Sequence, residues 1–155
     1  MQKPVTAKRL ENIALFYLER FDASSDKLRQ VLKRRLRRQK MQGIEVAPEA
    51  ADWIENVIQK MQNLGYVNDD RYAENAVRRL SGQGKSALYI RQKLKAEGLK
   101  ESLINPYLAG QNDLERAKIF VQKKRLTQTE KDLAKLARAG FDYETAKQAL
   151  SEGAK

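Results

Sequence analysis

The chain has 155 residues, 41% hydrophobic and 33% charged, which suits one domain or a short array of small units with a buried core. It contains no cysteine and no histidine, which excludes disulfides and thiol nucleophiles and removes the commonest general acid–base and metal ligand. The net charge of +11 predicts attraction to a polyanion or to an acidic protein surface.

The positive charge is concentrated in two blocks. Residues 27–44 carry eight Lys or Arg and no acid, and residues 71–100 carry eight against two acids. Residues 45–70 between them hold six acids and one lysine. Because a solvated helix normally interleaves both signs, these blocks favour a binding surface over an ordinary solvated face.

The chain begins with two expected helices. Apolar residues at helical spacing predict the first over residues 7–21. Either Ser24 or Ser25 offers an N-cap oxygen for the second, which is expected to end near Gly43. This second helix carries most of the first basic block on its outward surface.

A third helix is expected from Pro48, placed as its first residue, to a stop at Gly65. The residues of its apolar stripe are Trp53, Ile54, Val57, Ile58, Met61 and Leu64. Asn68 or Asp69 then caps a fourth helix. A turn with two glycines over residues 81–85 separates it from a fifth, which stops at Gly98.

The remaining expected helices are shorter. One contains Pro106, which costs a backbone hydrogen bond. Asn112 with Glu115, and Thr127 with Glu130, have the spacing of capping boxes that open two further helices. After a stop at Gly140, Asp142 caps the last helix.

The nine expected helices fall into three groups of three. A shift of 62 residues pairs Leu28-Arg29-Gln30 with Ile90-Arg91-Gln92, and a shift of 42 pairs Gly98 with Gly140. Chance similarity between amphipathic helices is the alternative. We predict an all-α fold of three tandem three-helix repeats, residues 1–65, 66–110 and 111–155, stacked into an elongated, curved body.

The central repeat carries a recognisable order of residues. They are Gly65-Tyr66, Asp69-Asp70-Arg71-Tyr72-Ala73, Gly84, Ile90-Arg91-Gln92, Leu94 and Gly98. In this order and spacing the block resembles the RecX family of bacterial regulators of the RecA recombinase. The chain departs from the family in Gly84-Lys85-Ser86-Ala87, where a Gly-x-Gly-Pro run is common, and in Val67, where leucine is common.

The resemblance implies a non-enzymatic inhibitor without a cofactor. It implies binding to RecA and to its filament on single-stranded DNA, with lower ATPase and strand-exchange activities. Duplex DNA is a further possible ligand. The opening residues are no signal peptide and no apolar run could cross a membrane, so we expect a cytoplasmic monomer.

The candidate partner-binding residues are basic and lie in rows at helical spacing. They are Arg29, Lys33, Arg34, Arg37, Arg38, Arg71, Arg78, Arg79, Lys85, Arg91 and Lys95. They would contact the RecA filament, its DNA or both. Two roles are open for Arg71, which either stabilises the helix cap at Asn68 or faces a partner.

Other motifs favour structural roles. Asp69 and Asp70 suit a helix start better than a catalytic or metal site, because adjacent residues do not point at one place. Tyr66 and Tyr72 are expected in the core rather than as base-stacking platforms. The Gly-Lys-Ser of residues 84–86 lacks the spacing and the preceding strand of a phosphate-binding loop. A general DNA-binding protein is the alternative function, and an enzyme has no catalytic constellation behind it.

Overall fold

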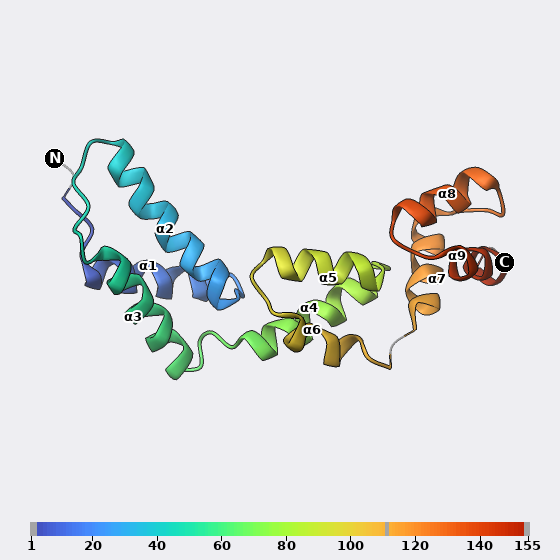
Figure 1. Ribbon diagram of the computed structural model, residues 1–155, viewed down its shortest axis with the longest axis horizontal. Helices are drawn as coiled ribbons and strands as arrows, with labels where there is room; N and C mark the ends of the chain where they lie inside the picture. The colour runs from blue at the N-terminus through green and yellow to red at the C-terminus, as the bar shows by residue number, and fades with distance from the viewer. Residues whose placement is uncertain (1–2, 111, 154–155) are drawn as a thin grey trace. The chain divides into compact units, whose positions relative to one another are not determined.

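The computed structural model describes residues 3–110 and 112–153, which form nine α-helices and no strand (Figure 1). The all-α prediction is therefore confirmed. The chain divides into two compact units, one ending at Tyr72 and the other beginning at Ala73. Because α4 (Asp69–Gly82) crosses this division in its first turn, it belongs to both.

The first unit is built from α1 (Ala7–Arg20), α2 (Ser25–Met41) and α3 (Ala50–Asn63). Thr6 caps α1 and Ser24 caps α2, each accepting a hydrogen bond from the backbone N–H three residues later. Of the two serines offered by the sequence, Ser24 is thus the cap of α2. Gly43, in the left-handed region at φ +80°, lets the chain turn away after α2.

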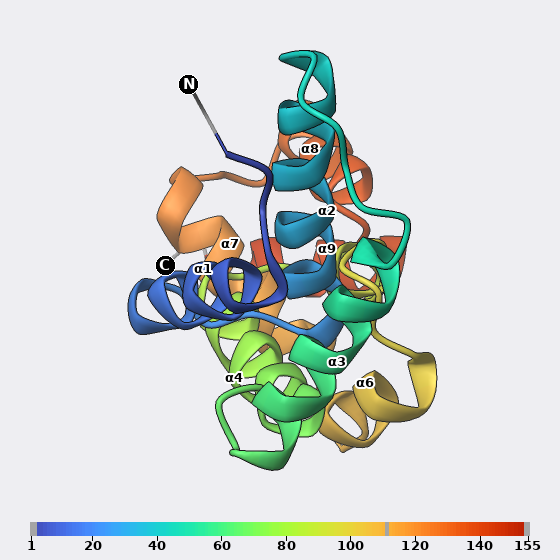
Figure 2. The ribbon, with the colours of Figure 1, turned by 90° about the vertical axis from the view of Figure 1, so that its left-hand side faces the viewer.

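An extended link, residues 44–47, leads from α2 to α3. In Figure 2 this link runs to the right of α2 and the N-terminal segment that precedes α1 runs to its left. Pro48 was expected to be the first residue of α3, and this prediction is wrong. Pro48 and Glu49 form a turn, and the helix begins at Ala50. The amide of Ala50 donates to the carbonyl of Ala47 at 3.1 Å, which closes this turn.

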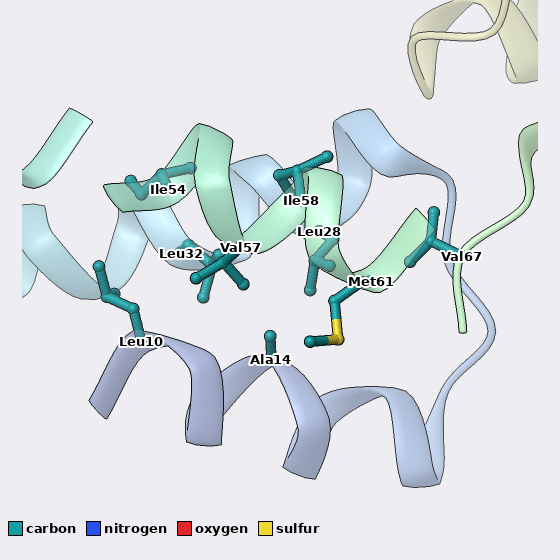
Figure 3. Packing of buried hydrophobic residues seen from close by; sticks show 9 residues of the cluster. All are labelled: Leu10, Ala14, Leu28, Leu32, Ile54, Val57, Ile58, Met61 and Val67. Carbon is teal, nitrogen blue, oxygen red and sulfur yellow. The ribbon is translucent and has the colours of Figure 1, made fainter. Parts of the chain in front are cut away.

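The core of the first unit lies between its three helices. Figure 3 shows Leu10 and Ala14 of α1 directed towards side chains from α2 and α3. The other buried members are Leu28, Leu32, Ile54, Val57, Ile58, Met61 and Val67. Trp53 packs against this cluster from a partly buried position, whereas Leu64 is 55% exposed and lies outside the core. Leu64 was expected inside, but it follows the last turn of α3, where the stripe no longer faces α1 and α2.

The second unit contains most of α4 and the last five helices. They are α5 (Ala87–Ala96), α6 (Glu101–Leu108), α7 (Asp113–Lys124), α8 (Glu130–Arg138) and α9 (Tyr143–Gly153). Pro106 lies inside α6, as expected. Asp142 caps α9 by accepting from the amide of Thr145 at 2.8 Å, which confirms that prediction.

The two predicted capping boxes form only in part. Asn112 accepts from the amide of Leu114 at 2.8 Å, but Glu115 pairs with Lys118 instead of reaching back. The cap of α8 lies two residues later than expected. There Thr129 is the N-cap and accepts from the amide of Asp132, but the carboxylate of Asp132 accepts from the backbone N–H of Thr127 and not from that of Thr129, so the reciprocal bond of a capping box is not made.

Within the second unit, the turn between α4 and α5 is tied to α7 and α8. Gly84 approaches α7 so closely that a Cβ atom there would lie 2.7 Å from the backbone nitrogen of Phe120. Ser86 donates from its hydroxyl to the carbonyl of Ala139 at 2.9 Å. Arg116, which is buried, donates to the hydroxyl of Ser81 at 3.1 Å. The Gly-Lys-Ser run therefore serves packing.

Candidate basic interface on helix α2

Helix α2 carries its cations in two rows on different sides. Lys33, Arg37 and Lys40 follow Arg29 at spacings of four, four and three residues, so they share one face. Arg34 and Arg38 form the second row, turned away from the first by about one residue's rotation, near 100°. The side chains of Lys33, Arg34, Arg37, Arg38 and Lys40 are all exposed.

The first row begins with an arginine that is already paired. Arg29 donates from Nε to Oε2 of Glu55 on α3 at 2.7 Å and from a terminal nitrogen to Oε1 at 3.1 Å, a bidentate contact. A second bond reaches Asp26 at 3.2 Å. This contact raises the pKa of Arg29 and holds the pKa of Glu55 below its usual range. Arg29 is thus engaged inside the unit.

The cations that follow Arg29 in the same row have no carboxylate partner at ion-pair distance in the part of the chain that the structure describes. Helix α3 begins at Ala50, so beyond Lys33 the row faces the link instead of an acidic helix surface. Within the described residues, Lys33, Arg37 and Lys40 have no carboxylate within ion-pair distance. These three cations are therefore available to a partner.

Beside this row lies a groove of about 610 Å³ between α2, the link and the start of α3. Its apolar lining comes from Leu36 of α2, from Ile44 and Val46 of the link and from Ile54 of α3. Lys33, Arg37 and Lys40 stand along the α2 side. The groove thus combines an apolar surface with a cationic edge.

On the other side of α2 is a smaller and more polar hollow of about 310 Å³. Lys3 of the N-terminal segment lines it together with Arg35, Arg38 and Gln39 of α2. The carbonyl oxygen of the Gln39 side chain accepts from the backbone N–H of Val5 at 3.2 Å. Its amide nitrogen is buried and has no hydrogen-bond partner among the described residues. Cations and a spare donor suit an anion here.

The basic residues of the central block are mostly engaged nearby. Arg71 donates to the carbonyl of Gly65 at 3.2 Å, so it ties the end of α3 to the start of α4. Arg78 pairs with Glu74, and Lys95 with Glu101, both at 3.0 Å. The remaining contacts are Arg91 to Asn105 at 3.1 Å and Lys85 over the ring of Tyr89 at 4.9 Å. Arg79 is exposed.

These surface contacts constrain their cations only weakly. The Arg78 side chain is 71% exposed and that of Lys95 is 53% exposed, so solvent screens both pairs. Either cation can exchange its internal carboxylate for one on a partner at little cost. The structure thus separates the part of the first row beyond Arg29, which forms no ion pair among the described residues, from a partly neutralised surface on α4 and α5.

The aromatic prediction is half right. Tyr72 is buried, as expected, but Tyr66 is 52% exposed. Tyr66 follows the left-handed Gly65, and the turn that this glycine makes directs the chain so that Val67, not Tyr66, enters the core.

Two features of the site were not visible in the sequence. The apolar groove depends on Ile44 and Val46, two residues of the link that show no periodicity. The buried Gln39 looked like one more polar residue of a basic helix. The signal that could have found it is its position three residues after Leu36 and seven after Leu32, which places Gln39 on the apolar stripe of α2.

Neither a metal site nor a membrane span is found in the described part of the chain. No three Asp or Glu carboxylates gather there as they would around a metal ion. No helix in residues 3–110 and 112–153 is long and apolar enough to cross a bilayer.

Comparison with known proteins shows which family this chain resembles. Residues 68–108 match the family described as RecX, second three-helix domain. A regulatory protein RecX from Myxococcus xanthus is 35% identical over 164 aligned positions, covering 96% of this chain and 87% of the relative. A regulatory protein RecX from Legionella pneumophila is 38% identical over 60 residues, 39% of this chain and 40% of its own length.

The fold has a relative among solved structures as well. The crystal structure of RecX from Lactobacillus salivarius superposes with a TM-score of 0.66 at 19% identity. It covers 95% of this chain and 96% of that one. At this identity the match concerns the fold alone, which is built of three-helix domains. The repeat boundaries after residues 65 and 110 stay a prediction.

Proposed function

Because the chain belongs to the RecX family of regulatory proteins, we propose that it binds the RecA filament on single-stranded DNA and inhibits its ATPase and strand-exchange activities. It would then be a negative regulator of homologous recombination and DNA repair, within the SOS response. It acts through binding, without catalysis or a cofactor, as a cytoplasmic monomer. The observation that carries the proposal is the resemblance over nearly the whole chain to a regulatory protein RecX.

The basic rows of α2 support a polyanionic or acidic partner. Arg37 and Lys40 form no ion pair among the described residues, Lys33 has only a longer-range attraction to Glu55, and Arg34 and Arg38 add a second exposed row. A nucleoprotein filament offers both phosphates and acidic protein surface to such cations. Contacts of this kind would bridge neighbouring subunits and hinder the motions that accompany ATP turnover.

The test is to add the protein in substoichiometric amounts to RecA on single-stranded DNA and to follow ATP hydrolysis. We expect the rate to fall well below that of the filament alone. Heat-unfolded protein at the same concentration serves as the control for non-specific effects of a basic chain. An unchanged rate of hydrolysis would refute the proposal.

A general DNA-binding protein is the second candidate, favoured by the hollow lined by Lys3, Arg35 and Arg38. In that case, competition for DNA alone would lower the ATPase. The variant Arg34→Glu with Arg38→Glu separates the two functions, since both side chains are exposed and neither belongs to the core cluster. If it loses DNA binding but still inhibits the preformed filament, the protein contact is primary. A proportional loss of both would favour the second candidate.

A further inference from the structure

We infer that the groove between α2, the link and the start of α3 binds an acidic, amphipathic segment of the recombinase protein rather than its DNA. The inference rests on the proposed function and names which part of the filament this surface takes. It divides the two basic rows of α2 between two kinds of partner. The row of Lys33, Arg37 and Lys40 is assigned to protein.

The first ground is the chemistry of the lining. Leu36, Ile44 and Val46 are half-buried and present aliphatic surface to the groove, whereas Ile54, at 1% exposed, adds little surface of its own. A DNA backbone offers charged phosphates and sugars and has no group that gains by covering aliphatic side chains, whereas Leu, Ile or Phe of a peptide does. The volume of about 610 Å³ accommodates two or three such side chains.

The second ground is charge. Three cations line one edge of the groove, and Glu45 of the link is the one acid among its described lining residues. A segment with apolar side chains alone would leave Lys33, Arg37 and Lys40 unmatched. Carboxylates spaced three or four residues apart on a helical segment would match their spacing along α2.

The third ground is an internal example of the same contact. On the same row, Arg29 already holds Glu55 of α3 in a bidentate pair, while the apolar stripe of α3 packs on α2. Helix α3 is thus an acidic amphipathic helix bound to the first part of the row. A partner segment would continue this arrangement along α2, in the space that α3 leaves because it begins only at Ala50.

The start of α3 adds a further preference for an anion. Ala50 and Ala51 line the groove, and Glu49 at the N-cap makes no capping hydrogen bond with its side chain. Helix α3 has 14 residues, so its N-terminal end carries a positive partial charge, which Glu49 at the N-cap and Asp52 in the first turn offset in part. A carboxylate of the segment, placed here, would supply the missing cap.

The first experiment fills the groove without changing the charge. Ala51 is exposed at its edge, and Ala51→Trp would occupy the space, while Ala134→Trp at an exposed position of α8 is the matched control. We expect Ala51→Trp to bind the RecA filament about tenfold more weakly, as for loss of an anchoring pocket. Affinity for naked single-stranded DNA, which depends on phosphate contacts, should change less than about twofold.

The outcomes separate this inference from the proposed function. If wild-type protein inhibits the filament and Ala51→Trp binds it equally well, only the groove inference fails. If Ala51→Trp loses affinity for naked DNA as much as for the filament, DNA occupies the groove and the inference is overturned. If wild-type protein neither binds nor inhibits the filament, the proposed function fails and the inference with it.

A second experiment avoids a bulky substitution. The chain has no cysteine, so Ala51→Cys provides a unique attachment point for a thiol-specific benzophenone cross-linker, with Ala134→Cys as control. On the RecA filament we expect cross-linking to one RecA segment that carries both apolar and acidic residues. Cross-linking to DNA, to a second copy of this chain or to a segment without acids would overturn the inference.

Discussion

The carboxylate of Asp69, at the start of α4, accepts two hydrogen bonds from Ser25, at the start of α2. The backbone N–H of Ser25 lies 2.7 Å from Oδ1 and its hydroxyl 2.7 Å from Oδ2. Asn68 meanwhile caps α4, accepting from the amide of Arg71 at 3.0 Å. Because Asn68 serves as the cap, the carboxylate of Asp69 is free to join two helix starts in the first unit.

Removing this carboxylate should destabilise the first unit. Asp69→Ala leaves the backbone N–H of Ser25, a residue only 8% exposed, without its partner, at a cost of about 1–3 kcal/mol. Ser25→Ala removes only the hydroxyl bond and should cost less. Trp53, the one tryptophan, packs against the core of this unit, so urea unfolding followed by its fluorescence measures the effect. Equal stabilities of Asp69→Ala and wild type would contradict the role given to Asp69.

Gly84 should not tolerate a side chain. An alanine there would sit at φ +80° with its Cβ 2.7 Å from the backbone of Phe120, so we expect a loss of about 1–3 kcal/mol. Gly82 is the matched control, because it is the last residue of α4 and a Cβ atom added there would meet nothing within 4 Å. Gly82→Ala should be neutral or stabilising by up to about 1 kcal/mol. Urea unfolding followed by circular dichroism distinguishes them, and similar midpoints for both variants would be the contrary result.

The pair of Arg29 and Glu55 predicts a specific acid dependence. Because the hydrogen bond from Arg29 lowers the pKa of Glu55 below its ordinary 4.5, the stabilisation is complete above that pH and is lost as the pH falls through the lower, folded-state value. At pH 7, Glu55→Gln should therefore be less stable by about 0.2–1 kcal/mol, since the pair is largely exposed to solvent.

That difference should shrink as the pH is lowered below 4.5 and also in 1 M salt, which screens exposed charges. The measurement is urea unfolding of both proteins at a series of pH values, followed by Trp53 fluorescence. A difference that stayed constant into the acid range would assign the stabilisation to packing instead of charge.

The second row of α2 predicts a change in salt sensitivity. Reversing Arg34 and Arg38 to glutamate should lower the salt slope of single-stranded DNA binding by about 1.4, since each lost phosphate contact removes about 0.7. The control reverses Lys123 and Lys124, two exposed lysines at the end of α7. Fluorescence anisotropy over a range of salt concentrations gives the slopes. The same decrease for both pairs would mean that DNA responds only to net charge.

Most of the fold could be predicted because its signals are local. Apolar spacing of three and four residues and left-handed glycines such as Gly65, Gly98 and Gly140 marked where helices lie and end. The errors lie at helix starts, where several candidates compete within a few residues. At α8 either Thr127 or Thr129 could be the N-cap. The hydroxyl of Thr129 accepts a hydrogen bond from the backbone N–H of Asp132, and the carboxylate of Asp132 accepts one from the backbone N–H of Thr127, so Thr129 is the cap.

From the sequence, the candidate site could be predicted only as a set of basic residues, without their pairing or their surroundings. The sequence does not distinguish Arg29 from Lys33 in their row, yet Arg29 forms the hydrogen-bonded pair with Glu55, whereas Lys33 lines the groove and attracts Glu55 only at longer range. Nothing in the spacing along α2 distinguishes them, because the difference depends on where α3 begins beside it.

The sequence by itself determined the all-α fold, the family and the basic character of α2, since each follows from residues close together in the chain. Which cations remain available, what lies beside them and what Asp69 bonds to were decided only by the tertiary structure. The physical reason is range. Helix periodicity and capping act over three or four residues, whereas Ser25 and Asp69 are 44 residues apart and Arg29 and Glu55 are 26 apart, so those contacts exist only once the helices have packed.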